Sequence, residues 1–326
     1  MNQMSHFPPR GVTPVSAKLA DAPVGLFRFA QLAGRNMLEV IPVETLRQTY
    51  LRGPLNIHYI CDPDIVTELL ENYDLDALHL DDYFYPYKIL GERFPDSSAF
   101  IRYGAGFTDI ADWRRDNTDR LVQGLAQRIR RLKPHVRLGI SPFGVWRNAE
   151  VDPEGSQTRA GATCYDDLYA DIRKWLFNGW IDYVAPQLYW HAGFELADFR
   201  TLLQWWSANS YGRRLYIGHA AYKVGQDEQA AWNDPAELPR QVRLTRLNET
   251  SRGSIFFRAA HLFQNPLGVA DSLRRQYRYR ALLPKITGPF SEQPHAPKLQ
   301  PPRRRQGGVL LRWQPATPDL ANPPAA

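Results

Sequence analysis

The chain has 326 residues, 44% of them hydrophobic and 23% charged, a globular composition that excludes a chain disordered throughout. It has no run of 18 apolar residues, and its N-terminus lacks an apolar segment, so we expect neither a transmembrane helix nor a signal peptide. The net charge of +6 comes from residues 270–326, which hold ten Lys or Arg and three Asp or Glu, so no uniformly basic nucleic-acid surface is expected.

Residues 1–53 carry no strong motif and form an unassigned N-terminal segment. The mixture of apolar and polar residues predicts one helix around residues 25–35 and a second over 42–51.

From residue 62 onward, helical spacing alternates with short apolar runs. We expect helices over 62–76, 117–134, 164–179, 198–210, 235–249 and 268–282, and strands over 77–80, 136–141, 180–190, 214–222 and 253–262. Five strand–helix units in strict alternation indicate an α/β fold with a parallel sheet. The leading architecture is a (β/α)₈ TIM-type barrel, incomplete because about five units are visible, and the alternative is an open doubly wound sheet.

The composition changes after this region, which we place at 54–283. Ten prolines fall between residues 284 and 326. We therefore read 284–306 as an exposed, extended linker rich in Pro and Arg. Residues 307–326 read as the truncated start of a β-sandwich, with one strand over 307–315.

The string HLDDYFYPY, residues 79–87, is the sharpest chemical feature. Two carboxylates, Asp81 and Asp82, end a buried strand, and aromatic residues including Tyr83 and Tyr85 follow them. Adjacent strand side chains face opposite sides, so only one carboxylate should point along the barrel axis. It would act as a general acid or stabilise charge in the transition state. The alternative reading of the pair is a helix cap or a salt bridge.

A second string, APQLYW, ends the strand predicted over 180–190. Gln187 suits an inward-facing hydrogen-bond donor, and Tyr189 and Trp190 suit a stacking wall. The alternative is a core glutamine bonded to backbone.

A third string, GISPFGVWRN, covers residues 139–148. Arg147 and Asn148 are placed on a loop where they would hold a ligand, and Trp146 would be a platform for it. The alternative is a rigid turn made by Pro and Gly.

Metal and cofactor signals are weak. His191, His219 and His261 fall at predicted strand ends, but a three-histidine metal site is disfavoured, and we expect no metal and no cofactor. Two cysteines, Cys61 and Cys164, are expected to be small buried residues.

HLDDYFYPY and four further strings resemble the glycosyl hydrolase-like 10 family of bacterial cell-envelope proteins over roughly residues 54–283. The other strings are GISPFGVWRN, GSQTRAGATCYDDLYADIRKWL (155–176), GWIDYVAPQLYW (179–190) and LYIGHAAYK (215–223). The resemblance implies a TIM-type barrel followed by a β-sandwich. It also implies hydrolysis of glycosidic bonds in N-acetylhexosamine polymers such as peptidoglycan strands, and an exported location. Members usually carry about three strand–helix units before the DDYFYPY strand, so we expect this chain to be truncated and, as written, cytoplasmic.

Most glycosidases use two carboxylates, whereas substrate-assisted cleavage needs one acid, a carboxylate that orients the N-acetyl group, and often a tyrosine donor. The residues expected to carry catalysis are Asp82 first, then Asp81 and Tyr189. Those expected to bind substrate are Tyr83, Tyr85, Trp146, Arg147, Asn148, Gln187, Trp190, His219 and Tyr222.

Three functions remain open from the sequence. The first is a glycoside hydrolase whose partner is a glycan polymer. The second is an inactive module that binds glycan through its aromatic platforms. The third is a non-functional truncated gene product.

Overall fold

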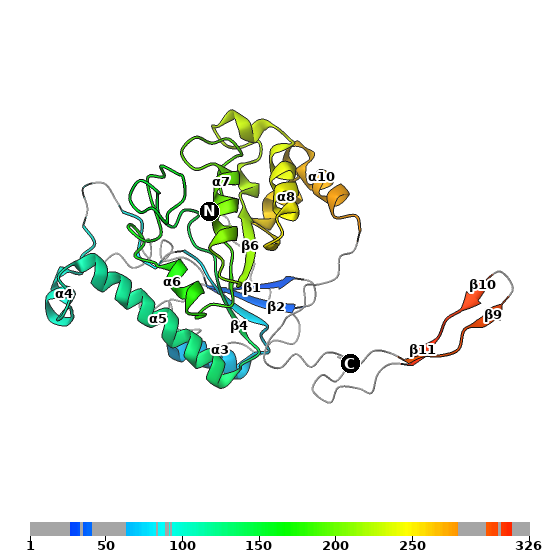
Figure 1. Cartoon of the computed structure of the whole chain (residues 1–326), viewed down its shortest axis with the longest axis horizontal. Coiled ribbons are helices and arrows are strands. Elements are labelled where there is room, and N and C mark those ends of the chain that lie inside the picture. The colour runs from blue at the N-terminus through cyan, green and yellow to red at the C-terminus, as the bar shows by residue number, and fades with distance from the viewer. Residues whose placement is uncertain are drawn as a thin grey trace. The chain divides into compact units, whose positions relative to one another are not determined.

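The computed structural model describes residues 27–32, 35–40, 63–82, 84–88, 91, 93–279, 298–305 and 308–314 (Figure 1). The chain divides into two units, Met1–Ala281 and Leu282–Ala326. The first unit alternates strands and helices: β1 Phe27–Leu32, β2 Arg35–Val40, α3 Pro63–Asn72, β3 Ala77–Leu80, α4 Ser97–Tyr103, α5 Ile110–Leu132, β4 Arg137–Ile140, α6 Ile172–Phe177, β5 Tyr183–Val184, α7 Phe199–Ala208, β6 Arg214–His219, α8 Glu237–Leu247, β7 Ser251–Phe256, α9 Ala259–Gln264 and α10 Val269–Gln276.

The sheet of the first unit follows the order of the chain. The strands lie side by side in the order β1, β2, β3, β4, β5, β6, β7. β1 pairs antiparallel with β2, and β2 to β7 are parallel. A doubly wound sheet reverses its strand order at a switch point, and this sheet does not. The fold is therefore α/β with the strand order of a TIM-type barrel, of which the described strands form a part.

The helices of the first unit pack on one another in pairs: α3 on α5, α5 on α6, α7 on α8 and α8 on α10. Leu78 of β3, Leu138 and Ile140 of β4, and Leu125 and Ile129 of α5 are fully or almost fully buried in the core between helices and strands. Burial of each such side chain contributes about 1.5–3 kcal/mol.

Side chains on the opposite face of the strands pack as they do inside a barrel. The ring of His79 on β3 stacks on Tyr183 of β5 at 5.6 Å between centroids, and Tyr183 meets the edge of Tyr216 on β6 at 5.7 Å. Gly139 of β4 provides the space for the Tyr183 ring, because a Cβ at this position would lie 1.9 Å from that ring. Side chains from alternate strands form layers in barrel interiors, and the contact between His79 on β3 and Tyr183 on β5 follows that rule.

Aspartates start three helices. The side chains of Asp109, Asp171 and Asp198 accept hydrogen bonds from backbone N–H groups in the first turns of α5, α6 and α7. Because Asp109 caps α5, that helix begins seven residues before the predicted start at 117, so the predicted start was wrong. The helix predicted over 164–179 shortens to α6, because Asp171 caps it.

The largest local correction lies near the N-terminus. The helix predicted around 25–35 is wrong, since β1 and the start of β2 form an antiparallel pair there. A short apolar run does not distinguish helix from strand, and pairing with a distant partner decides. The helix predicted over 42–51 lies outside the described residues. Two predicted strands also shorten: β5 spans two residues, and the second half of 253–262 belongs to α9.

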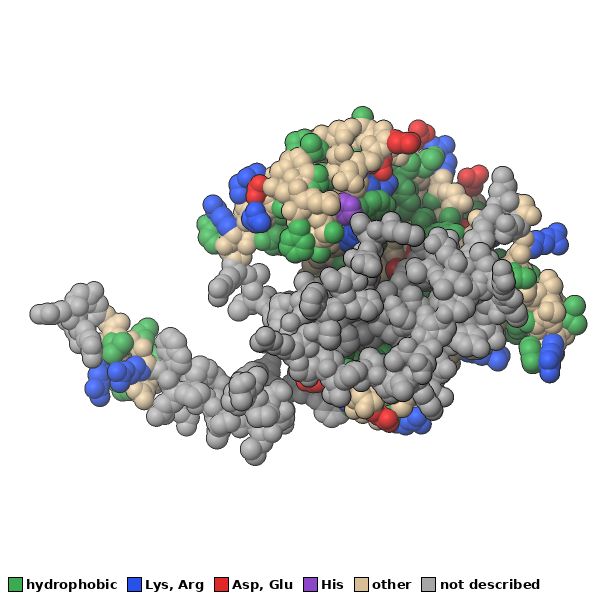
Figure 2. Space-filling model, turned by 180° about the vertical axis from the view of Figure 1, so that it is seen from behind, with side chains coloured by type: hydrophobic (Ala, Val, Ile, Leu, Met, Phe, Trp, Pro, Cys, Tyr) green, Lys and Arg blue, Asp and Glu red, His purple; other side chains and the backbone are tan. Residues whose placement is uncertain are grey.

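The second unit contains strands β8 Lys298–Leu299, β9 Arg303–Arg305, β10 Gly308–Leu310 and β11 Trp313–Gln314. β9 pairs antiparallel with β10, and β8 with β11. The predicted linker thus contains two strands, and 307–315 contains two short strands in place of one. Figure 2 shows Lys and Arg side chains beside hydrophobic ones on this unit. None of the helices in the described part of the chain combines the length and apolarity that a bilayer crossing requires.

Candidate active site

Two carboxyls follow β3 at the carboxyl edge of the sheet. Burial alternates along β3 and the alternation continues past its end, so Asp81 is half-buried and Asp82 is only 3% exposed. The backbone N–H of Asp82 donates to Oδ1 of Asp81 at 3.0 Å. Solvent therefore reaches Asp81 but hardly reaches Asp82.

Asp82 has an unusual environment for a carboxyl. The hydroxyl of Tyr87 donates to its Oδ2 at 2.6 Å, while its Oδ1 is fully buried and has no hydrogen-bond partner among the described residues. Burial raises the pKa of Asp82, and the hydrogen bond that Tyr87 donates acts in the opposite direction. Asp82 therefore keeps a proton to higher pH than an ordinary aspartate does.

Gln187 joins the ends of three strands. Its backbone bridges Phe143 on one side and Gly218 on the other, so it continues the sheet past β5. Its side-chain Nε2 donates to Asp81 Oδ1 at 2.8 Å and to the carbonyl of Ser141 at 3.0 Å. The sequence predicted an inward-facing donor here, and the structure places that donor on the Asp81 carboxylate.

One aromatic cluster lies on the Trp190 side of Gln187. The Phe143 ring meets the edges of Tyr87 at 6.0 Å and Trp190 at 5.4 Å. Gly144 permits this packing, because a Cβ there would lie 2.6 Å from the Trp190 ring and 2.4 Å from the Gln187 carbonyl. We call Tyr87, Phe143 and Trp190 the first aromatic cluster.

A second aromatic cluster lies on the Tyr189 side. Tyr189, Tyr222 and Phe257 pack on one another with centroids 5.9–6.1 Å apart. They follow β5, β6 and β7, so their strands all end at this edge. Phe257 is 43% exposed, and Tyr189 and Tyr222 are half-buried.

Two aromatic residues predicted to bind substrate are core residues instead. Trp146 is 4% exposed, stacks on Trp205 at 5.8 Å and donates from Nε1 to Asp171. Tyr85 is 3% exposed, and burial raises its pKa to about 12. Neither offers an open ring face, because the faces that a sugar would use pack on other side chains. Tyr83 lies outside the described residues.

His219 is a third correction. It is fully buried, and its ring nitrogens lie 3.3 Å from Gln241 Oε1 and 3.0 Å from Ser254 Oγ. Burial lowers its pKa to about 4, so the ring is neutral near pH 7. Its side chain follows the parity of Leu215 and Ile217, which face the helices. That period-two signal was present in the sequence.

Arg147 and Asn148 stabilise the loop that follows β4. Arg147 forms ion pairs with Asp152 at 3.0 Å and with Asp166 at 2.8 Å, and these carboxylates raise its pKa. Asn148 Oδ1 accepts from Thr158 Oγ1 at 2.8 Å and Ala160 N at 2.9 Å. The polar groups of Arg147 and Asn148 therefore bond within the loop. This agrees with the rigid-turn alternative that the sequence left open.

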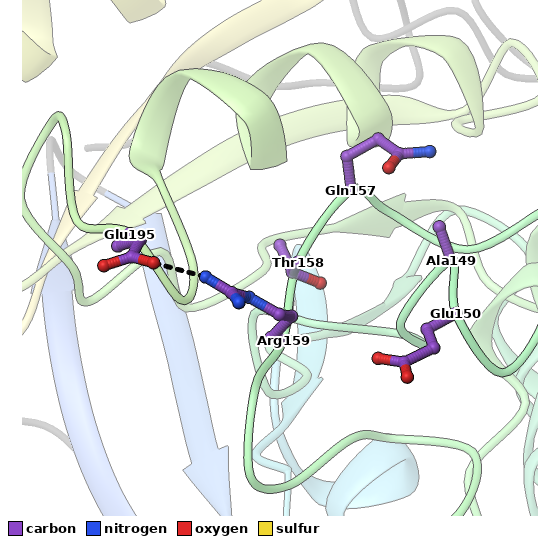
Figure 3. A pocket seen from close by; sticks show the side chains of 6 residues that line it. All are labelled: Ala149, Glu150, Gln157, Thr158, Arg159 and Glu195. Atoms are coloured by element: carbon purple, nitrogen blue, oxygen red, sulfur yellow. Dashed lines mark hydrogen bonds and ion pairs between the residues drawn. The ribbon is translucent and has the colours of Figure 1, made fainter.

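A surface cavity of about 390 Å³ lies beside this loop. Its lining comes from the loop after β4 and from Glu195, which follows β5, and Figure 3 shows Arg159 reaching across to pair with Glu195. The full lining is Ala149, Glu150, Gln157, Thr158, Arg159 and Glu195. Two acidic side chains and one paired arginine give it no net positive charge.

Three residues that build the site were missed from the sequence. Tyr87 stood within HLDDYFYPY and Phe143 within GISPFGVWRN, so the strings were identified but these members were not chosen. Phe257 directly follows β7, and the strand-end rule would have found it. No group of three His, Cys, Asp or Glu able to hold a metal occurs among the residues that the structure describes.

Functional groups of TIM-type barrels lie at the carboxyl edge of the sheet, and this chain has carboxyls and aromatic clusters at that edge. The family described as Glycosyl hydrolase-like 10 matches residues 57–234, and the chain belongs to this family. The resemblance seen in the sequence is thereby confirmed.

Curated relatives agree with this assignment. The chain is 47% identical over 251 residues to glycosyl hydrolase YngK of Bacillus subtilis, which covers 76% of this chain and 49% of that protein. It is 40% identical over 205 residues to glycosyl hydrolase DigH of Escherichia coli, covering 61% of this chain and 46% of that one. The chain thus spans about half the length of these relatives.

Proposed function

We propose that the chain is a glycoside hydrolase that acts on glycans containing N-acetylhexosamine, such as the glycan strands of peptidoglycan. Its place of action would then be the cell envelope, where that polymer lies. Family membership and relatives named as glycosyl hydrolases support the hydrolase class. The observation that carries the proposal is the Asp81–Asp82 pair, held by Gln187 and Tyr87 between two aromatic clusters.

The pair supplies both forms of a carboxyl that substrate-assisted cleavage needs. Two close carboxyls do not both ionise readily, so one stays protonated while the other carries the charge. Asp82 is the member whose pKa is raised by burial, and Asp81 is the member that solvent reaches. We assign substrate contact to Asp81, which reverses the order expected from the sequence, and a supporting role to Asp82.

The surroundings favour an N-acetylated sugar. Aromatic faces and edges on both sides of Gln187 suit the apolar faces of pyranose rings. In substrate-assisted cleavage the N-acetyl oxygen bonds to the anomeric carbon as the glycosidic bond breaks, and the leaving oxygen takes a proton that the pair supplies through Asp81, so no distant second carboxylate is required. Tyr189, in the second aromatic cluster, is the proposed hydroxyl donor to the reacting N-acetyl group.

The test compares oligosaccharides that differ only in the acetamido group. The full chain is incubated with chito-oligosaccharides, with peptidoglycan strands, and with cello-oligosaccharides of equal length, and new reducing ends are measured. We expect cleavage of the first two and none of the third, with Asp81→Asn inactive. Equal cleavage of the glucose polymer would overturn the substrate class. Binding without turnover would favour the glycan-binding module instead.

A further inference from the structure

Tyr87 belongs to the first aromatic cluster and also bonds to the carboxyl pair. Its hydroxyl lies 2.6 Å from Asp82 Oδ2, and its ring packs against Phe143. Phe143 in turn bridges Gln187, whose side chain holds Asp81. Tyr87 therefore contacts Phe143 and the buried Asp82 directly. It is connected to the half-buried Asp81 through Phe143 and Gln187.

We propose that Tyr87 is a positioning residue that acts through Asp82, fixing Oδ1 of Asp82 as the oxygen that carries the proton of the pair. This inference rests on the proposed function of the pair. The hydroxyl of Tyr87 satisfies Oδ2, so a proton on Asp82 goes to Oδ1. That oxygen is fully buried and has no hydrogen-bond partner among the described residues, and the backbone N–H of Asp82 lies 3.0 Å from Oδ1 of Asp81.

The hydrogen bonds of the pair leave one oxygen of Asp82 for the proton. Tyr87 donates to Oδ2, so under the proposal a protonated Oδ1 is the group that would donate toward the Asp81 carboxylate. Gln187 and the backbone N–H of Asp82 donate to Oδ1 of Asp81. Without the Tyr87 hydroxyl, either oxygen of Asp82 could hold the proton, and Asp81 would lose a defined donor.

Among the residues that the structure describes, the ionisable groups that interact with Asp82 are Asp81 on the same strand end, Tyr87 after it, and Cys164 from the loop that follows β4. Burial raises the pKa of the Cys164 thiol well above its usual range, so this group stays neutral. Changes in the titration of Asp82 therefore report on Asp81 and Tyr87.

The test replaces the Tyr87 hydroxyl and keeps its ring. Tyr87→Phe is compared with Tyr169→Phe, which removes a buried hydroxyl that accepts from Arg114 at 2.7 Å away from the pair. The Tyr87 bond favours the ionised form of Asp82, so its loss should move the limb of the pH–rate profile that Asp82 controls up by about one pH unit. We expect kcat to fall about tenfold with KM little changed, and no movement of that limb in Tyr169→Phe.

A second measurement does not need turnover. A carboxyl whose folded pKa is raised contributes stability at low pH, and this is lost as pH rises through that pKa. From about pH 4 upward, Tyr87→Phe should therefore lose stability faster than wild type, and the extra loss should vanish in the Asp82→Asn background. If Tyr87→Phe changes the slope of stability against pH equally in the wild-type and Asp82→Asn backgrounds, the role of Tyr87 is overturned. A pH–rate profile of Tyr87→Phe identical to that of wild type would overturn it as well. A wild-type chain that cleaves no glycan would overturn the proposed function, and the slope comparison would still decide the role of Tyr87.

Discussion

The end of β3 and the loop after β4 lie at the same edge of the sheet, and both are rich in charged groups. In the loop, Arg147 pairs with Asp152 and Asp166, so positive and negative charges neutralise each other. At the end of β3, two carboxyls of like charge lie side by side and receive hydrogen bonds from the neutral side chains of Tyr87 and Gln187.

This difference separates structure from chemistry. Opposite charges hold each other in the ionised form, so the loop gains rigidity and no reactivity. Burial favours the protonated form of Asp82 beside the Asp81 carboxyl, and a protonated carboxyl is the state that proton transfer needs. Changes in the loop should therefore appear in stability, and changes at the end of β3 should appear in rate.

The largest effect is expected at Asp81. The amide in Asp81→Asn keeps the shape but can neither carry the charge nor pass on the proton of the pair, so kcat should fall by about 10²–10⁴-fold with glycan affinity nearly unchanged. Asp82→Asn should cost less, because Asp82 acts through Asp81. Turnover and affinity are measured for both variants, with Asp112→Asn, in an exposed ion pair, as control. Unchanged turnover in both variants would remove the pair from the mechanism.

His219 lies at the end of β6, but a change there should appear in stability, as changes in the loop after β4 should. Its folded pKa of about 4 lies below the ordinary 6.5, so the unfolded chain binds more protons between these values. Stability is present above pH 6.5 and is lost as pH falls to 4, by about 3 kcal/mol. In His219→Gln, the slope of the unfolding free energy against pH between pH 4 and 6.5 should decrease by the contribution of one proton. Denaturant unfolding at several pH values measures this slope. An unchanged slope would show that His219 is charged in the fold.

Arg147 tests the loop itself. Arg147→Gln leaves two half-buried carboxylates without their cation and should lower the free energy of unfolding by about 2 kcal/mol. Turnover of the folded fraction should stay close to wild type. Arg159→Gln breaks the exposed pair with Glu195 in the same region (Figure 3) and should change stability by about 0.5 kcal/mol or less. A large loss of turnover with unchanged stability in Arg147→Gln would contradict the conclusion that the loop after β4 serves stability and the end of β3 serves catalysis.

The sequence reached the parallel sheet because the pattern of buried strands and amphipathic helices is local. It missed β1 and β2 because their pairing joins segments whose own patterns are ambiguous. β5 was overestimated because the apolar run over 180–190 continues into a rim segment in which Gln187 alone of the described residues makes isolated bridges, to Phe143 and to Gly218.

The site was predicted in part for the same reason. Strand ends are readable from the sequence, so Asp81, Asp82 and Gln187 were found together. The burial of Trp146 and Tyr85 was not readable, since it depends on where Trp205 and Tyr169 lie in the fold. An aromatic residue beside a carboxylate is a platform only if its face stays open, and that is a tertiary property.

A smaller effect on turnover than at Asp81 is expected at Tyr189, where the ring stays and only the hydroxyl goes. The ring should keep its packing on Tyr222 and Phe257 in Tyr189→Phe. One hydrogen bond to developing charge would be lost, which should lower kcat about tenfold, or about 1.4 kcal/mol. Tyr103→Phe, on an exposed tyrosine of α4, is the control. If Tyr189→Phe weakens glycan affinity and leaves kcat unchanged, the second aromatic cluster binds sugar only, and the donor to the N-acetyl group must be sought elsewhere on this edge.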